Sequence, residues 1–441
     1  MSAVSALRDP APEEAGREGQ RGQAAQSNHT LAAVGAVEGA FFARALTVWQ
    51  PEHGRKGLPW QGTRDAYRIW VSEIMLQQTQ VAAVIGYYTR FLARFPTLES
   101  LAGASLDEVL ALWSGLGYYR RARLLHACAI EVCRSYGGSF PDHPDVLRKL
   151  PGIGRSTAAA IAVFAFGRRA AILDGNVRRV LSRYFALHPT PPGSHNERLL
   201  WELAESLVPP APSLSEARES PEVVTYTQAL MDLGATRCLP RRPVCKACPL
   251  VTACKAYASG EPTRFPEPRT RPRLPTRRWV FLLVRWRDQI LLQKRPDCGV
   301  WASLWSLPEL PPSAASESSP PGGHAVRNWL VFTGLIPGPD AEFALSEGLT
   351  VEQSFSHFRL HAPVLQVEIP GHAKPQVCLS SPGPRPASLG RLHPAFASEP
   401  RFRSAISTLD PSAIDWCWVN RHEALAMGIP AALRRLLEAA G

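Results

Sequence analysis

Four cysteines that lie close together in the chain are the residues best suited to bind a metal. They are Cys238, Cys245, Cys248 and Cys254, and six, two and five residues separate them. Thiolates are ligands for zinc and for iron–sulfur clusters, and short loops can wrap four of them around one metal centre. The prolines between them predict a loop, which argues against four buried free thiols. The spacing favours a metal site and leaves zinc and iron both open.

Two carboxylates stand in patterns on which acid–base chemistry can be built. Glu73 lies in a predicted helix beside Trp70, Ile74 and Met75. Such neighbours desolvate a carboxyl and raise its pKa, which suits a general acid. Asp174 follows Ile172 and Leu173 and stands just before another predicted helix. Taken alone, its Asp-Gly-Asn string favours helix N-capping, and Glu73 alone favours an ordinary solvated glutamate.

A glycine-rich turn offers a phosphate site. Leu150 to Ile161 reads LPGIGRSTAAAI, in which two glycines after a proline make a tight turn that opens a helix. The backbone N–H groups at such a helix start can face a phosphate. A plain helix–helix turn remains the alternative. Cations around the cysteines also suit phosphate contact: Arg237, Arg241, Arg242 and Lys246.

Composition points to a nucleic-acid partner and a reducing compartment. A length of 441 residues predicts two domains. The net charge of +11 favours a polyanionic binding partner, and the alternative is that the basic excess is incidental. The nine unevenly spread cysteines do not resemble a secreted disulfide framework. No apolar run reaches the ~20 residues of a membrane span, and the N-terminus has no signal core. We therefore expect a cytoplasmic, nucleoid-associated protein with no membrane partner and no targeting signal.

The elements that must position these residues fall into two regions. The expected fold class is multidomain, with a mostly α region followed by a small α+β domain. The expected segments are a disordered stretch at 1–34, a helical domain at 35–258 with a loop insertion at 208–223, a basic Pro-rich linker at 259–278, and an α+β domain at 279–441 with a disordered insertion at 371–412.

Particular helices and strands follow from periodicity. Helical stretches are predicted at Ala66–Phe95, Leu106–Tyr136, Ser156–Phe166 and Ala431–Ala440. Strands are predicted at Trp279–Trp286, Gln289–Gln293, Gln353–Leu360, Val364–Ile369 and Ile414–Val419.

Four strings together resemble one known family. They are SEIMLQQTQV at 72–81, LPGIGRSTAAAI with ILDGNV at 150–161 and 172–177, the cysteine loop at 238–254, and FSHF at 355–358. They are similar to the adenine DNA glycosylase (MutY) family, within the helix-hairpin-helix DNA glycosylase superfamily, and residues from 279 onward resemble a Nudix domain. The resemblance covers about 37–369 and 414–441. It implies a [4Fe–4S] cluster on the four cysteines.

The resemblance also implies a role for each site residue. Glu73 would protonate the adenine, Asp174 would stabilise the positive sugar, and Asn176 would assist by hydrogen bonding. Relatives with lyase activity hold a lysine where this chain has Ser156, so a monofunctional enzyme is implied. The implied adenine pocket is Trp60, Gln61, Ser156 and Gln228. The implied contacts to DNA and 8-oxoguanine are Gln78, Thr79, Leu116, Tyr118, Pro151, Gly152, Ile153, Gly154, Phe355, Ser356 and His357.

The implied function is hydrolysis of adenine from double-stranded DNA where it is mispaired with 8-oxoguanine or guanine, by a monomer. A pyrimidine-lesion glycosylase with AP lyase activity is one alternative, opposed by Ser156 and the second domain. A non-catalytic DNA-binding protein is another, opposed by the presence of both Glu73 and Asp174. A nucleotide-cleansing hydrolase would need a glutamate-rich helix for magnesium, and Ala325–Gly334 carries no carboxylate.

Overall fold

The computed structural model describes most of the chain. The residues described are 36–187, 195–210, 220–266, 273–310, 323–371, 374–375 and 415–439. The segment expected to be disordered at 1–34 lies outside them, as do residues 211–219 of the first insertion and 376–412 of the second. No helix among the described residues is both long and apolar enough to cross a bilayer.

Residue contacts divide the chain into two compact units. Unit 1 is Met1–Ile74 with Ser139–Thr270, and unit 2 is Met75–Gly138 with Arg271–Gly441. The expected segments 35–258 and 279–441 follow chain order, whereas residues 75–138 group with the C-terminal part. The boundary between the units falls inside one helix.

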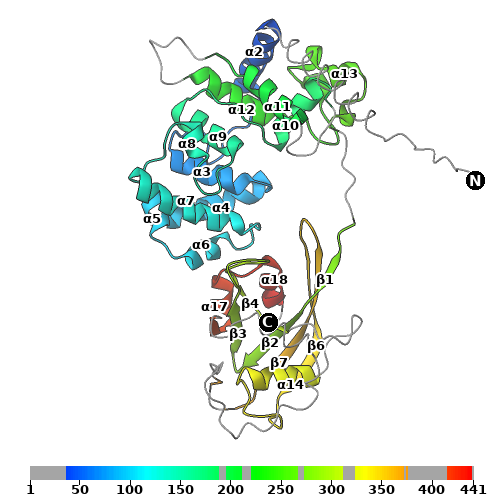
Figure 1. Ribbon diagram of the computed structural model, residues 1–441. Coiled ribbons are helices and arrows are strands. Elements are labelled where there is room, and N and C mark those ends of the chain that lie inside the picture. Colours follow the sequence, from blue (N-terminus) through cyan, green and yellow to red (C-terminus); the bar gives the residue numbers. More distant parts are fainter. Residues whose placement is uncertain are drawn as a thin grey trace, which may run out of the picture. The chain divides into compact units, whose positions relative to one another are not determined.

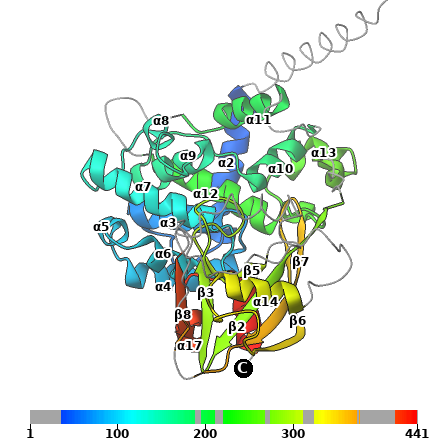
Figure 2. The ribbon, with the colours of Figure 1, turned by 60° about the horizontal axis from the view of Figure 1, so that its bottom comes forward.

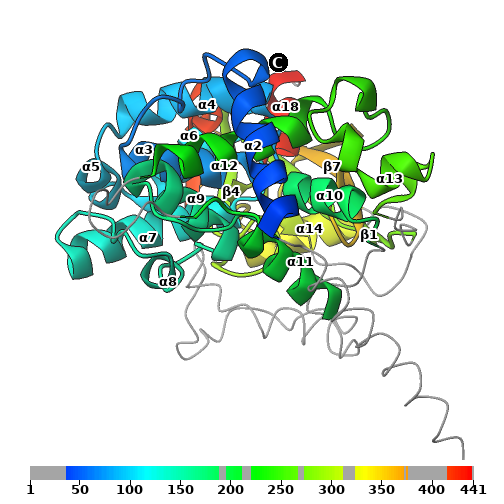
Figure 3. The same cartoon turned by 90° about the horizontal axis from the view of Figure 1, so that it is seen from above.

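Unit 1 is helical and has its own core. Its elements are α2 (Ala36–His53), most of α3 (Ala66–Leu76), α8 (Pro144–Leu147), α9 (Arg155–Phe166), α10 (Gly175–Tyr184), α11 (His195–Ser206), α12 (Pro221–Thr236), η1 (Cys245–Ala247), η2 (Val251–Ala253), α13 (Lys255–Ala258) and η3 (Pro262–Arg264) (Figure 1). Phe42 and Leu46 of α2 pack with Tyr226 and Leu230 of α12, and α2 runs beside α12 (Figure 3). Burial of these large side chains supplies the main stabilisation of the unit.

Local signals fix where the helices of unit 1 begin and end. Ser220 caps α12 by accepting from the Val223 N–H, and Pro221 occupies the first turn, where its missing N–H costs no helix bond. Gly167 ends α9 in the left-handed conformation that glycine adopts without strain. The expected helix Ser156–Phe166 is thus present and is one residue longer at its start.

Unit 2 combines four helices of the α region with a mixed sheet. The helices are α4 (Val81–Arg94), α5 (Leu98–Ala102), α6 (Leu106–Trp113) and α7 (Arg120–Tyr136). The strands are β1 (Thr276–Arg278), β2 (Val280–Trp286), β3 (Gln289–Lys294), β4 (Trp305–Ser306), β5 (Glu309–Leu310), β6 (Ala344–Ser354), β7 (Arg359–Glu368) and β8 (Trp416–Asn420). Among the described residues of this part, the helices are α14 (Gly323–Phe332), α17 (Arg421–Ala426) and α18 (Ala431–Ala439).

The sheet has the order β1-β7-β2-β3-β4, and β5, β6 and β8 pair with β2, β7 and β3. β2 and β7 are parallel, whereas β6 and β7 form an antiparallel hairpin. α14 lies against one face of the sheet, where Val326 and Leu330 join the core formed by Leu282 and Leu365 (Figure 2). An α+β domain of this kind was expected.

Three expected elements differ from the structure. Ala66–Phe95 is two helices, because Gln78 takes a φ of 56° and the chain turns between α3 and α4. Leu106–Tyr136 is likewise broken at Ser114–Tyr119. The run expected as one strand at Gln353–Leu360 is divided between two: its ends belong to β6 and β7, and residues 355–358 form the tip that joins them. Each difference lies at a short chain reversal within a stretch whose hydrophobic pattern is otherwise regular. Hydrophobic periodicity alone does not detect such a reversal.

Candidate active site and metal centre

The two predicted catalytic carboxylates of unit 1 interact electrostatically. Glu73 is partly buried on α3, and burial raises its pKa from the ordinary 4.5 to about 7. The negative charge of Asp174 raises this pKa further, while the Arg55 guanidinium opposes the shift. A carboxyl that titrates near neutrality is poised to donate a proton and to take it back, as general acid–base catalysis needs.

Asp174 is held by the helix that it opens. Its Oδ1 accepts a hydrogen bond of 2.7 Å from the Val177 N–H, which makes it the N-cap of α10. The interpretation of Asp174 as a helix N-cap is therefore correct. A capping residue can also have a catalytic role. Capping fixes the rotamer and places the carboxylate at the positive end of a helix dipole.

Ser156 links the glycine turn to the catalytic turn. Its Oγ accepts a hydrogen bond of 3.1 Å from the Leu173 N–H, one residue before Asp174. In the predicted phosphate-binding turn, Gly152 has a φ of 74° and Gly154 caps α9 without a side chain. That helix start accordingly offers backbone N–H groups rather than a side-chain cap. Pro151 and Ile153 lie in the same turn, with Ile153 buried.

A buried ion pair that the sequence did not indicate joins two residues of the predicted adenine pocket. Asp232 is fully buried on α12, and its Oδ1 accepts 2.7 Å from Arg55 Nε and 2.9 Å from Gln228 Nε2. Gln61 Nε2 in turn donates to the Arg55 carbonyl at 3.1 Å. Trp60 is the partly buried neighbour of Gln61. The same Arg55 cation acts on Glu73, so the pocket residues and the acid share one charged network.

Asn176 lies at a close contact between α10 and α12. Its Oδ1 accepts a hydrogen bond of 2.9 Å from Arg179, whose guanidinium also donates to the Gly234 carbonyl at 2.7 Å. A Cβ built on Gly234 would come within 2.7 Å of the Asn176 Cβ. Gly234 is thus needed for close helix packing, which also fixes the start of α10.

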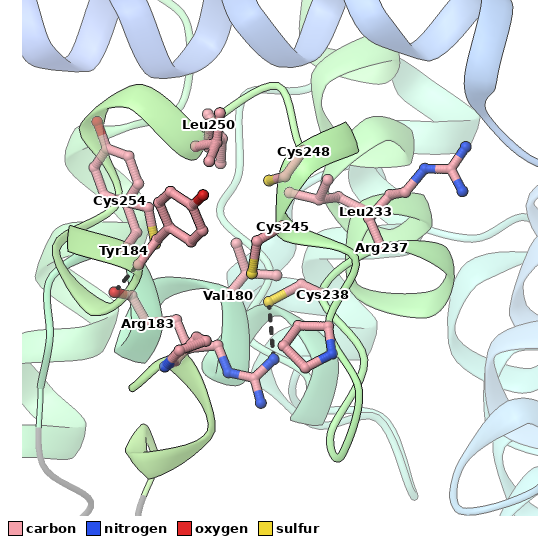
Figure 4. Close-up of a pocket in the computed structure, with 14 residues that line it drawn as sticks. Val180, Arg183, Tyr184, Leu233, Arg237, Cys238, Cys245, Cys248, Leu250 and Cys254 are labelled. Carbon is pink, nitrogen blue, oxygen red and sulfur yellow. Dashed lines mark hydrogen bonds between the residues drawn. The ribbon is translucent and has the colours of Figure 1, made fainter. Parts of the chain in front are cut away.

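The four cysteines line one pocket of unit 1, together with Tyr184 and Arg183 (Figure 4). Arg183 is buried and ties the loop to α10: its guanidinium donates to the carbonyls of Leu239 and Pro240 and to Cys238 Sγ at 3.4 Å. Among the residues that the structure describes, no three or more His, Cys, Asp or Glu side chains are arranged to hold a metal ion. A cluster of several metal atoms separates its thiolate ligands further than one ion does.

Two observations test whether the cysteine pocket suits a thiolate-bound group. Burial raises the pKa of the Cys245, Cys248 and Cys254 thiols, so a positive centre is required to hold them as thiolates. Tyr184 Oη lines the same pocket, is buried, and has no hydrogen-bond partner among the described residues. A soft, positively charged group with its own acceptors would satisfy both, so the residues fit an iron–sulfur cluster.

In unit 2, one arginine forms hydrogen bonds to both of the segments that are predicted to insert into DNA. Arg121 donates to the carbonyls of Gln77 and Gly117 and, at 3.0 Å, to Thr79 Oγ1. Desolvation lowers the pKa of this guanidinium to about 10, so it remains charged at neutral pH. Arg121 was not predicted, because its bonds reach more than forty residues back along the chain.

The predicted wedging residues differ in exposure. Gln78 is exposed, and Tyr118 is 53% exposed with a φ of 51°. Leu116, in contrast, is only 7% exposed. Tyr118 and Gln78 are therefore accessible from solvent, whereas Leu116 lies in the core of unit 2, which argues against its predicted contact with DNA.

The predicted lesion-reading residues form the tip of the β6–β7 hairpin. The Phe355 N–H donates to the Phe358 carbonyl at 2.8 Å, and the two rings stack with centroids 4.5 Å apart. Ser356 and His357 are exposed at this tip, with Ser356 Oγ and His357 Nδ1 3.2 Å apart. A hydroxyl and an imidazole presented together can donate to and accept from the edge of a base.

Comparisons with known proteins first define the class. Residues 71–206 match the HhH-GPD superfamily of base excision DNA repair proteins, and residues 279–439 match the NUDIX domain. The structure of a thermostable thymine-DNA glycosylase is 29% identical with a TM-score of 0.45, and the match covers 51% of this chain and 99% of that one. The two family matches, together with the helical and sheet-containing regions of the structure, confirm the fold class expected from the sequence.

Relatives then define the family. The adenine DNA glycosylase of Buchnera aphidicola subsp. Baizongia pistaciae (strain Bp) is 39% identical over 269 residues, which are 61% of this chain and 73% of the relative. The adenine DNA glycosylase of Rattus norvegicus is 45% identical over 225 residues, 49% of this chain and 42% of its own. The chain belongs to the adenine DNA glycosylase family, as its four sequence strings indicated.

Proposed function

We propose that this protein is a monofunctional DNA glycosylase that hydrolyses the N-glycosidic bond of adenine mispaired with 8-oxoguanine, or with guanine, in double-stranded DNA. The observation that carries the proposal is the interacting pair of Glu73 and Asp174, one of which has a pKa near 7. A carboxylic acid with a raised pKa, acting beside a second carboxyl group, is the usual machinery for cleaving a glycosidic bond.

The chemistry follows from the two carboxyl groups. The adenine is flipped out of the duplex, and protonated Glu73 donates its proton to the base, so that the base leaves neutral. Positive charge develops on the sugar and is stabilised by the carboxylate of Asp174, held at the start of α10. Glu73, now ionised, accepts a proton from the attacking water. Ser156 supplies no amine, so no Schiff base with the sugar forms.

The remaining predicted residues bind and position. Trp60, Gln61, Ser156 and Gln228 would surround the flipped adenine, and the turn at 151–154 would hold a backbone phosphate. Gln78, Thr79 and Tyr118 would fill the duplex beside the extruded base, whereas the buried Leu116 would support their turn from the core. Phe355, Ser356 and His357 would read the 8-oxoguanine. The protein would act as a monomer in the cytoplasm, on the nucleoid.

We also propose that Cys238, Cys245, Cys248 and Cys254 hold a [4Fe–4S] cluster. When bound, it would cross-link the loop whose arginines and lysine can contact DNA phosphates. Purified protein should be brown, with absorbance near ~400 nm, four irons and four sulfides per chain. A colourless protein that binds one zinc would contradict the assignment, and Cys248→Ser should lower the iron content.

A single-turnover assay tests the activity. The substrate is a duplex with adenine opposite 8-oxoguanine, and products are analysed with and without alkali. Strand breaks that appear only after alkali are expected. Breaks without alkali would contradict the monofunctional proposal. No excision by folded, cluster-loaded protein would contradict adenine removal altogether.

A further inference from the structure

The turn that carries Tyr118 is attached to the C-terminal domain within unit 2. This turn, Ser114–Tyr119, joins α6 to α7, and its reversal depends on left-handed residues at Gly115, Gly117 and Tyr118. A tyrosine in that conformation is strained, so surrounding contacts must hold it there. Some of these contacts come from the segment between α17 and α18, more than three hundred residues away.

Two hydroxyl groups of the turn bind that segment. Ser114 Oγ donates to the Ile429 carbonyl at 2.6 Å and accepts from the Arg434 guanidinium at 3.0 Å. Tyr119 Oη donates to the same carbonyl at 3.4 Å and accepts from the Ala431 N–H at 3.2 Å. Tyr119 Oη also accepts from the Gly115 N–H at 3.3 Å. The hydroxyls therefore tie both ends of the turn to one point of the C-terminal domain.

The attachment is tightly packed as well as hydrogen-bonded. A Cβ at Gly428 would lie 3.0 Å from the Leu110 Cβ of α6. Arg434 is held in turn by the Leu425 carbonyl at 2.7 Å, so its orientation does not depend on Ser114. The C-terminal side of the contact is thus preformed, as a positioning element requires.

We propose that Ile429 and Arg434 are positioning residues for the wedging turn, so that the C-terminal domain sets the conformation of Tyr118 in addition to reading the opposite base. The inference rests on the proposed role of Tyr118 in DNA. A structural contact of this kind would let the hairpin tip and the wedge act on one duplex with a fixed spacing, because both belong to unit 2.

The test removes the two hydroxyls and leaves the turn otherwise unchanged. In the full-length protein, Ser114→Ala with Tyr119→Phe should lower excision at saturating enzyme about tenfold, the equivalent of about 1.4 kcal/mol. The fluorescence rise of 2-aminopurine placed beside the 8-oxoguanine should fall with it. The pH profile should keep its shape, because Glu73 belongs to the other unit. A matched control is Asp107→Asn, which removes the negative charge from the 2.8 Å ion pair between α6 and Lys294 of β3. This variant should change neither signal by more than about twofold.

Four outcomes distinguish the positioning role of the C-terminal domain from the wedging role of Tyr118. Normal fluorescence and rate in the double variant would overturn the proposal, as would equal losses in the double variant and in Asp107→Asn. Tyr118→Ala is measured beside them: if it behaves as the wild type, the wedge itself is refuted. If only Tyr118→Ala loses the fluorescence rise, Tyr118 inserts into DNA as proposed, but the C-terminal domain does not position it. Gly428→Ala, which acts from the C-terminal side, should reproduce the double variant.

Discussion

The two proposed catalytic carboxylates and the hairpin tip differ in how they are positioned and in how exposed they are. Glu73 and Asp174 lie on or at helices, one desolvated and the other fixed as a helix cap. Ser356 and His357 project from a four-residue reversal and are exposed, with stacked phenylalanine rings beneath them. Chemistry needs a shifted pKa and hence burial, whereas reading a base edge needs free donors and acceptors. Substitutions should therefore change the rate in the first region and selectivity in the second.

The largest effect is expected at the acid. Glu73→Gln keeps the shape of the side chain and removes the proton donor, so single-turnover excision of adenine should fall about 10⁴-fold. Binding to a duplex with adenine opposite 8-oxoguanine should remain, as gel shift would measure. Near-normal excision would refute Glu73 as the acid, and lost binding would point to a fold defect.

The next largest effect is expected at Asp174, where two substitutions distinguish the capping role of the side chain from the role of its negative charge. Asp174→Asn should keep the bond to the Val177 N–H and lose the anion, so that excision falls roughly 10²–10³-fold without loss of stability. Asp174→Ala should lose about the same rate and also about 1 kcal/mol of unfolding free energy. Equal stability of the two variants would contradict the capping role. Unchanged excision by Asp174→Asn would contradict the catalytic one.

A third prediction concerns stability and pH. The pKa of Glu73 is higher in the folded protein than in the unfolded chain, so its favourable contribution is complete below pH 4.5 and is lost as pH rises through about 7. Between pH 5 and 8 the wild type should lose about 2 kcal/mol relative to Glu73→Gln, which has no such titration. Urea unfolding at both pH values measures this difference. Parallel pH dependence in the two proteins would contradict the raised pKa.

The smallest effect is expected at the hairpin tip. His357→Ala and Phe355→Ala should each lower the preference for adenine opposite 8-oxoguanine over adenine opposite guanine about tenfold, the value of one lost base contact. Excision opposite guanine serves as the internal control and should change little. A uniform loss on both substrates would mean that the tip supports the fold or the general binding of DNA.

Local chemistry was predictable from the sequence, whereas long-range pairing was not. The cysteine loop, the glycine turn and strands such as β2 follow from residue types and periodicity, and the structure contains them. The residues around Asp174 by themselves predicted only a helix N-cap. The catalytic role proposed for Asp174 came from the family resemblance. Asp232 lies four residues after Gln228 on one helix face, a spacing that could have drawn attention to it. Its partner Arg55 is 177 residues away, and no local pattern encodes that contact.

The turn between α3 and α4 was missed for the same reason, and the turn at Ser114–Tyr119 only in part. Gln78 and Tyr118 are ordinary residues in left-handed backbone, held there by Arg121 and, for the second turn, by the segment at 429–434. The second turn contains Gly115 and Gly117, whereas the turn at Gln78 has no glycine or proline to signal a reversal. Tertiary contacts impose the turn at Gln78, so it can be found only once the chain is folded.

The close approach at Gly234 has a consequence for inherited variation. The spacing between α10 and α12 leaves no room for one additional methyl group at that position, because the Asn176 Cβ would be 2.7 Å away. Any replacement must push α10, and Asp174 opens that helix. A single-nucleotide change at this codon could thus disable repair while every catalytic group is still encoded. A genetic survey that inspected only the reactive residues would score such an allele as harmless.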